Sequence, residues 1–123
     1  MLNEINYLYN IRLEKIREAY FRIGYLKCPC LNNQHVYFNQ IGFRHFLRKG
    51  RLIRPIKDQI RRFGLFEFAV HAITSNETQV VEIRQNRGFV SYALELKISK
   101  NYKVKIIVIR NDEGHYHFVS IMD

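Results

Sequence analysis

The sequence lacks several features that mark particular protein classes. It has no tryptophan, two prolines and two cysteines in 123 residues. No apolar run approaches the ~20 residues that a membrane-spanning helix needs. The first residues, MLNEINYLYN, lack the charged-then-apolar order of a signal peptide. These absences predict a cytoplasmic protein that has no membrane partner.

Common catalytic and metal-binding motifs are absent as well. The chain has no phosphate-binding loop, no dinucleotide-binding glycine motif, no nucleophile elbow and no helical pair of metal-binding histidines. Cys28 and Cys30 lack the second pair that a structural zinc site needs, and they are too close for an unstrained disulfide. His115 and His117 share one strand face, but two ligands alone make a poor zinc site. We therefore expect no metal and no cofactor.

The length and composition predict one domain spanning 1–123. A hydrophobic fraction of 47% is enough for a single core and argues against disorder. Within this domain we expect an N-terminal helix over 1–26, a basic helical region over 27–76 and an antiparallel sheet over 77–123.

Three segments have helical periodicity. Apolar residues recur at spacings of three and four between Asn3 and Tyr25. After a short β-like run at HVYFN, Asn39 is expected to cap a helix from Gln40 to about Lys49, which Gly50 ends. Pro55 suits the first turn of a further helix, which Gly64 bends or splits and which fades by TSNET.

Four runs of β-branched and aromatic residues follow, and short turn sequences separate them. They are QVVEIRQ, FVSYALELKIS, YKVKIIVIR and HYHFVSIM. Short turns make successive strands antiparallel. The sequence therefore predicts an α+β fold, with two or three N-terminal helices packed on a C-terminal four-stranded antiparallel β-meander. Strict alternation in the last strand predicts His117 on one face and Ser120 on the other.

Basic residues are concentrated in one segment. The formal net charge is +9, and eight cations lie between Arg44 and Arg62 beside one acid, Asp58. A local excess of this kind favours a polyanionic partner, RNA above all. The residues predicted to contact the RNA backbone are Arg44, Arg48, Lys49, Arg51, Arg54, Lys57 and Arg61.

The remaining polar residues suffice for RNA cleavage without metal. The ribose 2′-OH is the nucleophile, so the protein needs a base, an acid and cations for the phosphorane charge. His45 is expected opposite the apolar face of its helix, beside Arg48 and Lys49. Histidine transfers protons near neutral pH, and spacing alone does not say which histidine is the base and which the acid.

A family resemblance adds to this interpretation. The segments HVYFNQIGFRHFLRKG, RPIKDQIRRF, YALELKI, VKIIVIR and HYHFVSIM, between about Lys27 and Met122, resemble the phage-associated branch of the barnase–EndoU–colicin–RelE-like (BECR) nucleases. The resemblance implies a toxin-like or phage-associated endoribonuclease that leaves a 2′,3′-cyclic phosphate. A cognate inhibitor protein is a candidate partner, although the sequence does not say whether one exists. The catalytic residues that the resemblance implies are His45, Arg110, His117 and Ser120. Tyr92 takes the place of a large aromatic residue in the second strand and is expected to contact RNA.

Two other functions fit the same residues. A non-catalytic RNA- or DNA-binding module would use the basic segment for phosphates. A protein-interaction partner, such as an antitoxin or a phage inhibitor, would use it for an acidic protein surface. The sequence does not identify the class of RNA.

Overall fold

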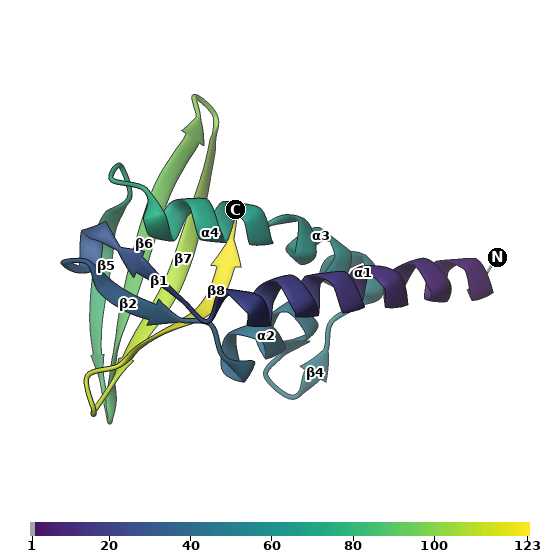
Figure 1. Cartoon of the computed structure of the whole chain (residues 1–123), viewed down its shortest axis with the longest axis horizontal. Coiled ribbons are helices and arrows are strands. Elements are labelled where there is room, and N and C mark those ends of the chain that lie inside the picture. Colours follow the sequence, from purple (N-terminus) through teal and green to yellow (C-terminus); the bar gives the residue numbers. More distant parts are fainter. Residues whose placement is uncertain (1) are drawn as a thin grey trace.

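The computed structural model describes residues 2–123 and confirms the α+β class. Within these residues four α-helices occur, all before the long strands of the sheet. They are α1 (Leu2–Ile23), α2 (Gln40–Leu47), α3 (Ile56–Gly64) and α4 (Phe66–Thr74). Figure 1 shows α1 extending away from the sheet, with its N-terminal end farthest from the strands. The predicted division of the third helical segment at Gly64 is confirmed.

Eight strands occur in the same part of the chain. They are β1 (Tyr25–Cys28), β2 (Gln34–Tyr37), β3 (Arg48–Lys49), β4 (Leu52–Ile53), β5 (Gln79–Asn86), β6 (Phe89–Ser99), β7 (Tyr102–Asn111) and β8 (Tyr116–Met122). Six of them form one sheet in the order β1-β2-β8-β7-β6-β5, and β3 and β4 pair separately. A short 3-10 helix, η1 (Pro29–Leu31), joins β1 to β2.

The predicted sheet of four strands is incomplete, because the sheet has six. The strands β5 to β8 pair antiparallel in chain order. The antiparallel hairpin of β1 and β2 then adds to the edge of β8 through a parallel pairing of Val36 with Tyr116 and Tyr37 with His117. Such short edge strands leave little pattern in a sequence, and their partner is remote in the chain.

One face of the sheet supplies most of the core. Alternate residues of β6, β7 and β8 are buried on this face, where β6 and β7 meet α4 and β8 meets α2. They include Leu94, Ile106 and Phe118. Tyr20 of α1 is fully buried among the aromatic rings, and its hydroxyl donates a hydrogen bond of 2.6 Å to the carbonyl of Asn39. This bond ties the long helix to the start of α2.

The helix α2 packs against the end of β8 that extends beyond β2. Gly42 permits this approach, because a Cβ atom there would lie 2.5 Å from the carbonyl oxygen of Phe118. Asn39 caps the helix, as predicted, and its side chain accepts a hydrogen bond from the backbone N–H of Ile41. The helix ends at Leu47, and the chain then turns at Gly50, where φ is +62°, into the β3–β4 hairpin. This hairpin replaces the last residues of the predicted helix.

A β-bulge in β8 changes which residues share a face. Val108 pairs with Phe118, but Ile107 pairs with Ser120, so Val119 is an extra residue. Residues that pair across a sheet lie on the same face. Ser120 therefore lies on the face of Ile107 and Ile109. The strict alternation predicted for this strand is wrong beyond Phe118.

Candidate functional site

The face of the sheet opposite the core carries the polar residues of β7 and β8. His117 pairs with Ile109, Ser120 with Ile107, and Met122 with Lys105, which places three residues of β8 on this open face. The face is hollowed beside Ser120, and the hollow has a volume of about 320 Å³. The residues that line it are Glu82, Arg84, Ser91, Ala93, Lys105, Ile107 and Met122. The bulge therefore brings His117 and Ser120 onto one surface with Lys105 and Arg84.

His45 and Ser120 line the same closed gap between α2 and β8, together with Arg62 of α3, and this gap is too small to hold a water molecule. His45 is half-buried there, instead of projecting with Arg48 and Lys49 as predicted. Burial, followed by the charges of Arg54 and Arg62, lowers the pKa of His45 below its ordinary value. The imidazole is therefore neutral at pH 7 and able to accept a proton.

Arg62 is held in place by its other contacts. Its Nη1 donates to the carbonyl of Ile121 at 3.2 Å, and its Nε lies 3.4 Å from the carboxylate of Asp58. The side chain is 16% exposed. A guanidinium fixed beside His45 and Ser120 supplies a positive charge at this gap.

His117 lies between two asparagines at the other end of α2. Its Nδ1 is 2.8 Å from Nδ2 of Asn39, and its Nε2 is 3.2 Å from Nδ2 of Asn111. The side-chain oxygens of both asparagines already accept backbone N–H groups, at Ile41 for Asn39 and at Glu113 and His115 for Asn111. Both amide NH₂ groups are therefore directed at the imidazole.

This arrangement favours one tautomer of His117. Nδ1 accepts the shorter hydrogen bond from Asn39, so the proton of a neutral ring lies on Nε2. A second proton, on Nδ1, would place two hydrogen-bond donors against each other, the Nδ1–H group and the NH₂ group of Asn39. Burial and then the nearby His115 lower the pKa of His117, in agreement with this geometry. Asn39, which contacts His117, precedes His45 by six residues, or about 9 Å of helix.

The structure does not bring Arg110 together with His45, His117 and Ser120. Arg110 pairs with Tyr116, one residue before His117, and so lies on the opposite face of the sheet. Its guanidinium lies 5.9 Å from the ring centroid of Tyr92. Tyr92 itself is 9% exposed and packs beside Tyr116, so the structure does not present its ring to a nucleic acid.

The predicted RNA contacts divide into two groups. Arg54 donates to the carbonyl of His45 and to Asp58, and its side chain is 9% exposed. Arg61 forms ion pairs with Asp58 and Asp123. These two residues therefore have structural contacts. The other five are exposed: Arg44, Arg48, Lys49, Arg51 and Lys57.

Three of these exposed cations lie on the β3–β4 hairpin. Arg48 and Lys49 form β3, and Arg51 follows Gly50 in the turn. Leu52 and Ile53 of β4 are 75% and 66% exposed, which is unusual for aliphatic residues. Figure 1 shows β4 apart from the main sheet. The hairpin thus presents positive charge and apolar surface together.

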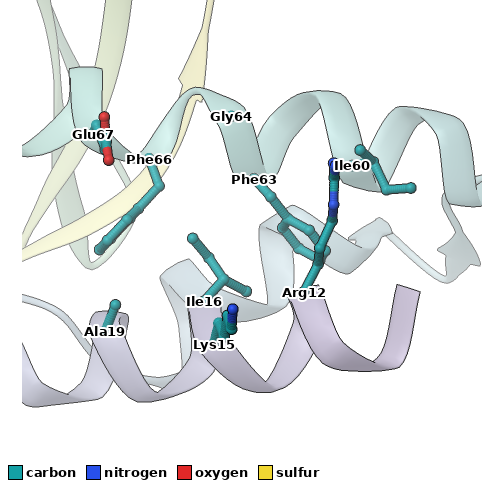
Figure 2. A pocket seen from close by; sticks show the side chains of 9 residues that line it. All are labelled: Arg12, Lys15, Ile16, Ala19, Ile60, Phe63, Gly64, Phe66 and Glu67. Atoms are coloured by element: carbon teal, nitrogen blue, oxygen red, sulfur yellow. The ribbon is translucent and has the colours of Figure 1, made fainter. Parts of the chain in front are cut away.

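A separate groove of about 510 Å³ lies between α1 and the region where α3 meets α4. Figure 2 shows Ile16 and Ala19 of α1 directed towards the segment that carries Phe63 and Phe66. None of the predicted catalytic residues lines this groove. We therefore place the candidate site at the open face and the adjoining gap.

The cysteines are free, and their sulfur atoms are 3.6 Å apart. Cys28 is buried and Cys30 half-buried at the start of η1. Within residues 2–123 no three His, Cys, Asp or Glu side chains gather as a metal site would require. In the same residues no helix is both long enough and apolar enough to cross a membrane.

Sequence reasoning missed four residues of the site: Asn39, Arg62, Lys105 and Asn111. Asn39 was expected only as a helix cap, and Arg62 only as part of the basic segment. Their roles depend on the bulge in β8 and on the parallel pairing of β2 with β8. Neither feature has a signal in a single sequence.

Comparisons of the chain with protein-family models, with curated proteins and with solved structures find no match.

Proposed function

We propose that the protein is a metal-independent endoribonuclease. In this proposal the ribose 2′-oxygen attacks the adjacent phosphorus, the bond from phosphorus to the 5′-oxygen breaks, and a 2′,3′-cyclic phosphate remains. The observation that carries the proposal is that His45, whose pKa is lowered, lines one closed gap between α2 and β8 together with Ser120 and the fixed cation Arg62. These groups match the needs of the reaction for a base, a hydrogen-bond donor and positive charge.

His45 accepts the 2′ proton, because its lowered pKa keeps it unprotonated at neutral pH. Ser120 donates a hydrogen bond to a non-bridging oxygen, and Arg62 offsets the charge that develops on the phosphorane. Lys105, which borders the hollow beside Ser120, adds a second cation. The 5′-oxygen takes its proton from His117 Nε2 or from water. Arg110 has no role in this arrangement, because it lies on the other face.

The test measures cleavage of a defined RNA by the purified protein, with and without EDTA, followed by analysis of the fragment ends. His45→Ala should lose roughly 10²–10⁴-fold in rate while remaining folded. His71→Ala is the matched control, because His71 is an exposed histidine of α4. Parental activity in folded His45→Ala, fragments with 3′-hydroxyl ends, or loss of cleavage in EDTA would each contradict the proposal.

A non-catalytic RNA-binding module is the second candidate. It is favoured by the exposed cations of the β3–β4 hairpin and by the hydrogen bond that holds Nδ1 of His117 to Asn39. This candidate predicts RNA binding without any fragments. The same exposed cations would suit an acidic partner, such as a cognate inhibitor protein.

A further inference from the structure

A row of aromatic rings lies on the open face at the β1–β2 edge of the sheet. Tyr25 pairs with Tyr37 in the antiparallel hairpin, and Tyr37 pairs with His117 across the parallel junction. Val36 is fully buried on the core face, so its neighbours in β2, His35 and Tyr37, lie on the open face. The row therefore adjoins the candidate site at His117.

Each ring of the row contacts its neighbour. The centroids of Tyr25 and His35 are 4.2 Å apart in a stacked arrangement, and Tyr25 lies 5.7 Å from Tyr37. Tyr37 then lies 6.3 Å from His115 and 6.2 Å from His117. We call these five residues the aromatic platform.

The platform is open to solvent. Tyr25 is 49% exposed and Tyr37 is 40% exposed. Other aromatic side chains of the chain, such as Tyr20 and Phe118, are fully buried in the core. Exposed aromatic rings on a sheet face provide a surface on which unpaired bases stack, irrespective of base identity. Bases within a duplex are already stacked on each other, so such a surface selects single strands.

The edge of the platform also carries two convergent hydrogen-bond donors. With Nδ1 of His117 accepting from Asn39, its Nε2–H faces the NH₂ group of Asn111 at 3.2 Å. Reversing the amide of Asn111 would break the hydrogen bonds that its oxygen accepts from the backbone N–H groups of Glu113 and His115. Two donors that face each other are best satisfied by a shared acceptor, such as a phosphate oxygen.

The charges around the platform indicate the path that a bound RNA strand would take. Lys27 pairs with His35 and is exposed on the same face. Glu113 lies 3.8 Å from His115, which makes that end unfavourable for phosphates. A bound strand would therefore run from Tyr25 and Tyr37 past His117 towards Ser120.

We propose that the aromatic platform binds single-stranded RNA, with bases stacked on Tyr25 and Tyr37 and a phosphate oxygen that accepts hydrogen bonds from both His117 and Asn111. This inference rests on the proposed function and specifies its substrate as an unpaired segment. It also gives His117 a binding role in addition to any proton transfer.

The test measures binding separately from cleavage, with a fluorescent 2′-O-methyl oligoribonucleotide that lacks the nucleophilic hydroxyl. Tyr37→Ala and Tyr25→Ala should each weaken binding by roughly 5- to 150-fold, the range for loss of one stacked base. Tyr37→Phe keeps the ring and should bind like the parent. Tyr7→Ala is the matched control, because Tyr7 is an exposed tyrosine of α1.

A second pair of variants tests the donors. Asn111→Asp keeps the oxygen that the turn needs but replaces the NH₂ donor, and it should weaken binding. Asn101→Asp, in the exposed turn after β6, adds the same charge elsewhere and should have a smaller effect.

The outcomes separate this inference from the proposed function. If the protein cleaves RNA but the tyrosine variants bind like the parent, or if duplex RNA binds as tightly as the single strand, the platform is refuted and the nuclease stands. If the tyrosine variants weaken binding but no RNA is cleaved, the platform stands and the nuclease is refuted.

Discussion

Gly42 is the residue at which the candidate site is most sensitive to a small change. A Cβ atom at this position would lie 2.5 Å from the carbonyl oxygen and 2.7 Å from Cδ2 of Phe118, and it would also overlap the hydroxyl of Tyr20. The first of these contacts is with backbone in the middle of β8, which cannot move without disturbing the sheet. Gly42→Ala should therefore push α2 away from β8 and separate His45 from Ser120.

The expected cost has two parts. Alanine favours a helix over glycine by up to about 1 kcal/mol, whereas overpacking of a core typically costs about 1–3 kcal/mol and sometimes more. Because rigid backbone opposes the new methyl group, we expect a net loss of about 2 kcal/mol in the free energy of unfolding. Urea denaturation followed by circular dichroism measures it.

Gly64→Ala is the matched control for this prediction. Gly64 ends α3, its φ is not positive, and an added Cβ would meet nothing within 4 Å. This variant should be as stable as the parent or slightly more stable. If Gly42→Ala and Gly64→Ala had equal stability, the close packing of α2 on β8 would be refuted.

Two further predictions concern charge. The pKa of His45 and of His117 is lowered in the folded state, so the unfolded chain binds more protons near pH 6. The free energy of unfolding should stay constant above the ordinary histidine pKa of about 6.5 and fall as the pH drops below it. His45→Gln should reduce this fall. Thermal unfolding between pH 5 and 8 measures both effects. Burial alone would raise the pKa of Asp58, but hydrogen bonds from Arg61 and Arg54 and the charge of Arg62 hold it below its usual range. Asp58→Asn should cost about 1 kcal/mol or less. It should tighten RNA binding at low salt, because it removes one of the two carboxylates that pair with Arg61, and unchanged binding would place the RNA elsewhere.

Much of the secondary structure could be predicted because its causes are local. The alternation in Phe89–Ser99 is the observed strand β6, and the cap at Asn39 and the division at Gly64 are where the sequence places them. The β1–β2 hairpin could not be placed, because it joins the sheet through two residue pairs with a strand about 80 residues later. The β3–β4 hairpin was missed because Arg48 and Lys49 fit the end of a helix equally well.

The candidate site was predictable in residue type but not in arrangement. His45, His117 and Ser120 are chemically suited to RNA cleavage whatever the fold, whereas their relation depends on a single extra residue, Val119. Without the bulge, alternation would direct Ser120 into the core and away from His117. The same change of face keeps Ile121 buried, at 1% exposure. One bulge therefore completes the core and the open face together, which explains why the strand departs from regular pairing at this position.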